Sequence, residues 1–112
     1  MTIREIAEVL NATVHAEPEL LDREATSAFG SDMMSDVLAY ASDHGLLLTG
    51  LLNPQVIRTA HMQDMVCVAI VRGKHATPEI LELAKACKIA VLETDFLMFE
   101  ACGLLYAKGL RR

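Results

Sequence analysis

The sequence predicts an α/β protein, a three-layer α/β/α sandwich with a mostly parallel sheet of about five strands. From residue 27 onward, short apolar segments alternate with amphipathic ones every 18 to 24 residues or so, which is typical of successive crossovers onto one sheet. The composition is 53% hydrophobic but only 4% aromatic, and such aliphatic cores are common where helices cover a parallel sheet. We expect a single domain over residues 1–112.

The N-terminal part is the least regular. Thr2 and Glu5 have the spacing of a capping box, and apolar residues recur after them at helical intervals, up to a stop at Asn11. No clear period is visible from Leu20 to Phe29. We expect a helix at residues 3–11, followed by a β-prone segment at residues 12–16 and a turn at residues 17–18. A strand is expected at residues 26–29.

After Gly30 the alternation of strands and helices is clear. Gly45 has the position of a left-handed residue that ends a helix. Three strands are predicted at residues 46–48, 66–71 and 89–92. Each helix follows residues suited to capping or starting a helix, and these are Ser31 or Asp32, Asn53 with Pro54, Thr77 with Pro78, and Thr94 or Asp95.

Turns that follow parallel strands meet at the carboxyl edge of the sheet, where open α/β proteins bind ligands. Backbone N–H groups of several helix starts would converge there, and Arg72 and Lys74 could offset negative charge. We therefore expect an anionic small molecule, with an adenine nucleotide as one candidate. The candidate ligand-binding residues are Gly30, Ser31, Asp32, Thr49, Gly50, Asn53, Arg72, Gly73, Lys74 and Thr94.

Charge and composition argue against several classes of partner. The formal charge of −5, from 15 acidic and 10 basic residues, disfavours nucleic acid. No apolar run approaches the roughly 20 residues needed to cross a bilayer, so no membrane association is expected. Three cysteines without C-x-x-C spacing indicate core residues in a reducing compartment, and we expect a cytoplasmic protein.

No catalytic constellation can be assembled, and we expect no enzyme and no cofactor. Gly73 and Lys74 resemble the end of a phosphate-binding loop, but the glycine and the hydroxyl residue that this loop requires are replaced by Val68 and His75. Ser31 lacks a G-x-S-x-G elbow, and capping explains it. The histidines at positions 15, 44, 61 and 75 are scattered, so we expect them to be solvated and predict no metal site.

One carboxylate pair, Glu93 and Asp95, follows a predicted strand. It could serve as a general acid or accept a hydrogen bond from an adenosine ribose. Capping and solvation explain the pair equally well.

The segments LLDREATSAFGSDMMSDVLAY, LLTGLLNPQVIRTA, VRGK and LETDFLMFEACGLLY resemble a stand-alone protein of the DRTGG-domain family over essentially the whole chain. The resemblance implies a three-layer fold similar to the N-terminal domain of HPr kinase/phosphorylase and to modules beside CBS domains in some pyrophosphatases. It also implies a regulatory or assembly role. The residues that name the family are largely absent, because the corresponding turns read TGLLNP and VRGK.

Two functions follow from these observations. The first is a non-catalytic regulatory or sensory module that binds a small anion. The alternative is an interaction module that assembles with a larger enzyme or signalling complex, for which the resemblance suggests a hydrogenase. Apolar residues cover nearly the whole circumference of the last predicted helix, so we also expect a homodimer in which this helix takes part.

Overall fold

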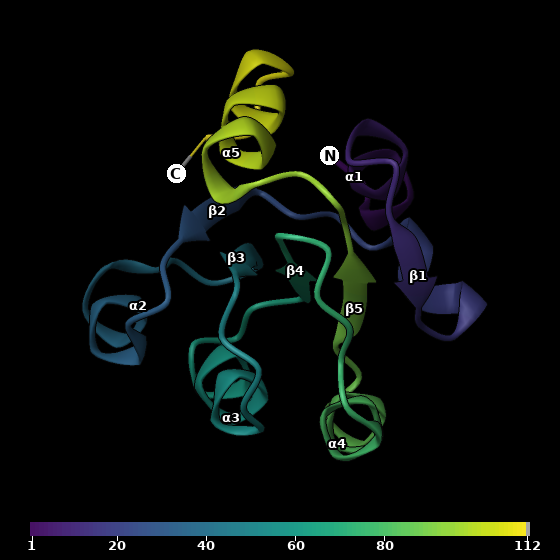
Figure 1. The fold of residues 1–112 in the computed structure, drawn as a ribbon, viewed down its shortest axis with the longest axis vertical. Coiled ribbons are helices and arrows are strands. Elements are labelled where there is room, and N and C mark those ends of the chain that lie inside the picture. Colours follow the sequence, from purple (N-terminus) through teal and green to yellow (C-terminus); the bar gives the residue numbers. More distant parts are fainter. Residues whose placement is uncertain (112) are drawn as a thin grey trace.

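The computed structural model describes residues 1–111 and contains one five-stranded sheet in the order β1-β5-β4-β3-β2 (Figure 1). The strands are β1 (Thr13–His15), β2 (Ser27–Gly30), β3 (Gly45–Thr49), β4 (Cys67–Ile70) and β5 (Ala90–Glu93). The helices are α1 (Ile3–Val9), the 3-10 helix η1 (Pro18–Asp22), α2 (Met34–Tyr40), α3 (Gln55–Met62), α4 (Pro78–Cys87) and α5 (Met98–Ala107).

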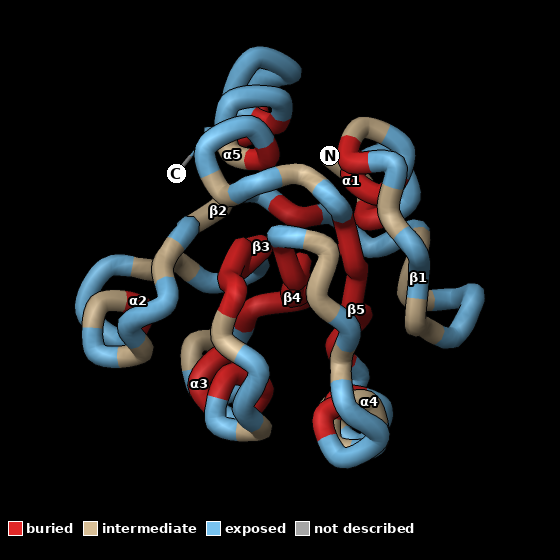
Figure 2. The backbone as a smooth tube through the Cα atoms, viewed as in Figure 1, coloured by how far each residue is buried: buried red, intermediate tan, exposed pale blue. Residues whose placement is uncertain are grey.

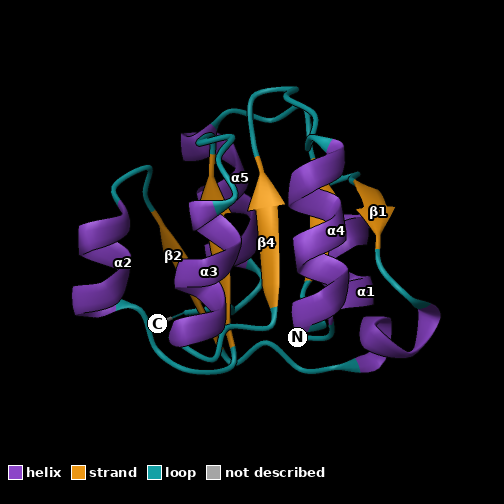
Figure 3. Cartoon of the chain, turned by 90° about the horizontal axis from the view of Figure 1, so that it is seen from below, coloured by secondary structure: helices purple, strands orange, loops and turns teal. Residues whose placement is uncertain are grey.

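Strands β2 to β5 are parallel, and β1 is added antiparallel to β5, with Thr13 opposite Glu93. Strand β4 occupies the middle of the sheet and all of its residues are buried. In Figure 3, β4 lies behind and between α3 and α4, and its arrowhead points toward the loops at the upper edge. The prediction of a mostly parallel sheet of about five strands is confirmed.

Helices cover both faces of this sheet, as the sequence predicted. In Figure 1, α1 and α5 lie on one face and α2, α3 and α4 on the other. Each face has its own apolar cluster, one including Ile6, Leu48 and Leu105, the other including Ile57 and Val91. Figure 2 shows the buried backbone concentrated in the central strands and on the inner sides of α3, α4 and α5.

Local capping signals fix two helix starts. The Thr2 hydroxyl accepts a hydrogen bond from the Glu5 N–H, and the Glu5 carboxylate accepts one from the Thr2 N–H, which completes the predicted capping box. The Thr77 hydroxyl accepts from the Ile80 N–H, and Pro78 is the first residue of α4. Both starts were predicted correctly.

Two helix ends differ from expectation. Helix α1 ends at Val9, with Leu10 as its C-cap, and Asn11 already has a positive φ of 49°. The left-handed residue before β3 is His44, with a φ of 54°, whereas Gly45 is the first residue of the strand. A Cβ at Gly45 would lie 2.9 Å from the Ser42 carbonyl oxygen, so close packing rather than backbone conformation requires a glycine there.

The last helix also begins later than predicted. Its N-cap is Leu97, which makes no side-chain capping bond, and neither Thr94 nor Asp95 caps it. The Thr94 hydroxyl instead donates to the Leu10 carbonyl oxygen at 2.7 Å and accepts from the Phe96 N–H at 3.3 Å. These bonds commit Thr94 to the turn after β5. None of the helices formed by residues 1–111 has the length and apolar character to span a membrane.

Candidate functional site

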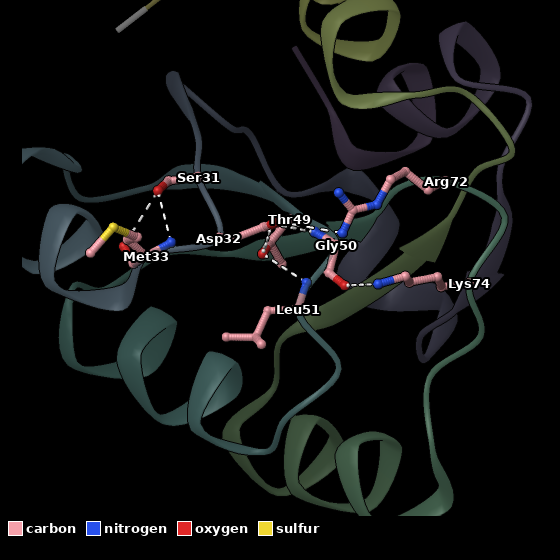
Figure 4. A network of polar contacts seen from close by, with 8 residues as sticks. All are labelled: Ser31, Asp32, Met33, Thr49, Gly50, Leu51, Arg72 and Lys74. Atoms are coloured by element: carbon pink, nitrogen blue, oxygen red, sulfur yellow. Dashed lines mark hydrogen bonds and ion pairs between the residues drawn. The ribbon is translucent and has the colours of Figure 1, made fainter.

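The turns that follow the parallel strands meet at the carboxyl edge of the sheet. Figure 4 shows six of the predicted residues there, in the turns that follow β2, β3 and β4: Ser31, Asp32, Thr49, Gly50, Arg72 and Lys74. The parallel pairing of these strands puts their ends side by side. The predicted convergence of these turns is therefore confirmed, whereas ligand binding by them stays a prediction.

Asp32 lies at the centre of the cluster. One of its oxygens, Oδ1, accepts hydrogen bonds from the Gly50 N–H at 2.7 Å and from the Thr49 hydroxyl at 3.0 Å. The other, Oδ2, lies 3.4 Å from a guanidinium nitrogen of Arg72. The Gly50 N–H lowers the pKa of the Asp32 carboxyl most strongly, and the Thr49 and Arg72 contacts add to this against the opposing effect of partial burial. Asp32 is thus an ionised carboxylate that accepts hydrogen bonds from groups of the same chain.

This role replaces the helix cap that the sequence suggested for Asp32. Helix α2 begins at Met34, and its N-cap Met33 makes no side-chain capping bond. The Ser31 hydroxyl accepts from the Met33 N–H at 2.9 Å, so it stabilises the turn that leads into α2. The expectation that Ser31 or Asp32 caps α2 directly is wrong, because the donors on the neighbouring strand hold Asp32 away from the helix.

Arg72 and Lys74 converge on Gly50 from the turn after β4. The Arg72 guanidinium lies so close to Gly50 that a Cβ there would overlap it. The Lys74 ammonium group donates to the Gly50 carbonyl oxygen at 2.8 Å. Both cations therefore already have oxygen partners at this edge.

The backbone of the same turn is held in an unusual conformation. Arg72 and Gly73 both have a φ of 69°, which is unfavourable for arginine and permitted for glycine. Their N–H groups donate to the carbonyl oxygens of Phe96 at 2.8 Å and Thr94 at 3.0 Å. The turn after β5 thus fixes the backbone that presents Arg72, and strain of this kind is common at functional sites.

The other predicted residues lie apart from this network. Asn53 accepts from the Gln55 N–H at 2.8 Å and so stabilises the start of α3, one residue later than the expected start at Pro54. Gly30 faces α5, where it lines a cavity of about 410 Å³ together with Cys102 and Arg111. The buried Thr94 hydroxyl is hydrogen-bonded to Leu10 and Phe96 and lies outside the Asp32 network, so we do not include Thr94 in the proposed site.

A second polar cluster was not predicted. At the end of β5, Glu93 Oε1 lies 3.1 Å from His15 Nε2 and 3.3 Å from His75 Nδ1, and Oε2 accepts from the Ala76 N–H at 2.7 Å. Burial would raise the pKa of the Glu93 carboxyl, but these three hydrogen bonds outweigh it and the pKa is lowered. His15 and His75 were expected to be solvated; His75 is indeed 81% exposed, but both rings also contact the Glu93 carboxylate. The only sequence signal was the position of Glu93 at a strand end.

Within the described part of the chain, residues 1–111, no group of three His, Cys, Asp or Glu side chains is arranged to hold a metal ion. His15, Glu93 and His75 form a hydrogen-bonded cluster. A cavity of about 290 Å³ lies beside it, lined by His15, Leu20 and Lys85 among others.

Comparison with known proteins agrees with this fold. No curated protein matches the chain significantly. A similar solved structure is that of the CBS and DRTGG domains of the regulatory region of Clostridium perfringens pyrophosphatase, complexed with the activator diadenosine tetraphosphate. The two share 19% sequence identity with a TM-score of 0.77, over 93% of this chain but only 45% of that one. This likeness shows a common fold.

The family assignment comes from the sequence itself. Residues 5–106 match the family described as the DRTGG domain. The match covers nearly all of the helices and strands described above. The chain therefore belongs to the DRTGG-domain family.

Proposed function

We propose that this chain is a non-catalytic regulatory module that binds a small anion between the turns after β2, β3 and β4. The proposed ligand groups are the Gly50 N–H, the Thr49 hydroxyl and the Arg72 guanidinium, with Lys74 beside them. Thr49 and Gly50 lie at the end of β3, and Arg72 and Lys74 lie in the turn after β4. A bound anion would therefore connect segments that are far apart in sequence.

The observation that carries this proposal is the position of Asp32. Its carboxylate receives a backbone N–H, a hydroxyl and an arginine, which is the set of donors that proteins use for phosphate and carboxylate groups. The Asp32 side chain lies in the loop between β2 and α2 and is 43% exposed to solvent. A ligand phosphate that replaced it would release the loop before α2, which is a physical route from binding to regulation.

The nature of the ligand is suggested by the fold. The pyrophosphatase region of similar fold was solved with diadenosine tetraphosphate, and that structure also contains CBS domains, which this chain does not span. Adenine nucleotides are therefore the first class to test, with inorganic phosphate as the simplest anion.

Calorimetric titration tests the proposal with ATP, ADP, AMP, diadenosine tetraphosphate and phosphate at millimolar concentrations. We expect binding by at least one of them, weakened about tenfold in Arg72→Gln through loss of a charge-assisted hydrogen bond. Asp32→Asn keeps a side-chain oxygen for Gly50 and Thr49 but removes the competing charge, so it should bind more tightly. Lys108→Gln, an equal charge change at the end of α5, is the control. Absence of binding by all five compounds to both wild type and Asp32→Asn would refute the anion site.

Self-assembly is a second candidate function, favoured by the outer face of α5. Ala101 and Leu105 of this helix are buried against the sheet, whereas Phe99 is 89% exposed and Tyr106 is also exposed. Phe99, Gly103 and Tyr106 are spaced at i, i+4 and i+7 and so share one face, and a Cβ at Gly103 would meet nothing within 4 Å. We propose that two copies pair through this face. Assembly with a larger enzyme would use the same surface.

A further inference from the structure

The Glu93 carboxylate connects two histidines from opposite ends of the sequence. Glu93 is only 8% exposed, and His15 and His75 both contact its Oε1 atom, from β1 and from the loop before α4 respectively. The Ala76 N–H on Oε2 fixes the carboxylate in place. The anion is thus buried and oriented, and it presents one oxygen to two imidazole rings.

This arrangement decides which nitrogen of His75 carries a proton. An ionised carboxylate only accepts hydrogen bonds, so the proton must be on Nδ1 of His75, which lies 3.3 Å away. In the neutral ring the other nitrogen, Nε2, then keeps its lone pair. The His75 side chain is 81% exposed, whereas His15 is 35% exposed, so the lone pair of His75 is the more accessible to a reagent in solution.

The other two histidines of the chain lack this combination. His44 contacts Asp43 at 3.4 Å, but both side chains are largely exposed, so water competes for their interaction. His61 lies exposed on α3, and no ion pair involves it among residues 1–111. His75 alone of the exposed histidines has a buried carboxylate behind its ring.

We propose that His75 is a nucleophile that accepts a phosphoryl group on Nε2 and that Glu93 positions it. The donor would be a small phosphoryl compound with a good leaving group, such as a phosphoramidate or an acyl phosphate. The Nε2 lone pair forms a bond to phosphorus while the bond between phosphorus and the leaving group breaks. The leaving group departs with that electron pair, as ammonia or as a carboxylate.

The proton on Nδ1 remains between the ring and Glu93 during this step. The carboxylate therefore offsets the positive charge that the ring acquires when Nε2 is phosphorylated. The product would carry new negative charge on the loop from Arg72 to Thr77, one residue from Lys74 and two residues before the N-cap of α4. Phosphorylation at His75 would thus act on the loop that also carries the cations of the carboxyl edge.

Potassium phosphoramidate is the probe, applied to the intact chain at about pH 8, where an ordinary imidazole is neutral. Intact mass should rise by about 80 Da for one phosphoryl group, and peptide mapping should place it on His75. Within the same molecules, His75 should react about tenfold faster than His61, the exposed histidine without a buried carboxylate. This comparison requires no variant and therefore no assumption about folding.

Variants distinguish the effect of Glu93 on the orientation of the His75 ring from the effect of solvent exposure on its reactivity. His75→Asn should remove the fast phase, and His61→Asn should leave it unchanged. Glu93→Gln, with its fold checked by circular dichroism, should slow His75 to within about twofold of His61. The proposal is overturned if wild-type His75 reacts no faster than His61, if the label goes to another residue, or if folded Glu93→Gln retains the fast phase.

Discussion

The guanidinium of Arg72 lies over Gly50, in the space that a side chain at position 50 would need. Arg72 is held there by its own left-handed backbone and by the Asp32 carboxylate. The lack of a side chain at position 50 therefore allows the guanidinium to occupy this place at the carboxyl edge.

A Gly50→Ala substitution should displace the Arg72 guanidinium, which is the end of a flexible and partly exposed side chain, and should cost about 0.5 to 1 kcal/mol through the lost contact with Asp32. In an Arg72→Ala background the same change should cost close to nothing, because no guanidinium remains to be displaced. Urea unfolding of the four proteins measures this coupling. Gly103→Ala is the matched control: an added Cβ meets nothing there, so stability should stay equal or rise slightly. Additive effects at positions 50 and 72 would contradict the close approach.

Asp32 should make stability depend on acid pH. Its pKa is lowered in the folded protein, so its contribution to stability is fully present above the unfolded pKa of about 3.9 and is lost as the pH falls through the folded value. Wild type should therefore lose more stability than Asp32→Asn when urea unfolding is repeated from about pH 5 down to about pH 2.5. Parallel pH profiles of the two proteins would mean that the Asp32 contacts do not persist in solution.

Thr94 should prove structural and not part of a ligand site. Thr94→Val removes a buried hydroxyl that donates to the Leu10 carbonyl oxygen and accepts from the Phe96 N–H. We expect a loss of about 1 to 3 kcal/mol, since both partners remain without a bond in a buried turn. Affinity for any anion found by calorimetry should be unchanged. A large loss of affinity in a stably folded Thr94→Val protein would return this residue to the site.

The proposed homodimer can be tested by light scattering after gel filtration at micromolar concentration. The expected mass is about 24.6 kDa, twice the chain mass of 12.3 kDa. Phe99→Glu should shift the mass to that of the monomer, because a charge would be buried at the proposed interface. Met62→Glu, which places the same charge on an exposed methionine of α3 on the opposite face of the sheet, should leave the dimer intact. A wild-type mass near 12 kDa rules out pairing.

The parts of the fold that were predicted from the sequence depend on short-range signals. Thr77 caps α4 through a bond that spans three residues, so the pattern Thr-Pro ahead of an apolar period was sufficient. The buried strand β4 was visible as a continuous apolar run. The parallel order of the strands then placed the polar turns at one edge without any knowledge of side-chain contacts.

The parts that were missed depend on long-range competition. Asp32 has the sequence position of a cap, but the Gly50 N–H, 18 residues away, binds its carboxylate instead. His15 reaches Glu93 only because β1 pairs antiparallel with β5, and no local pattern signals that pairing. Single-sequence periodicity indicates which face of an element is apolar, but it contains no information about which distant polar group is the better partner.

The pairing of β1 with β5 has a consequence for the order in which the protein forms during synthesis. Residues 1–16 leave the ribosome well before strand β5, with which β1 pairs, and before the Thr94 hydroxyl, which binds the Leu10 carbonyl oxygen across 84 residues of sequence. Strands β2, β3 and β4 can already pair with one another while β1 still lacks the strand with which it pairs. A nascent chain stalled before residue 90 should therefore contain a partial sheet and a β1 segment without its partner strand, and this is the form on which a chaperone would act.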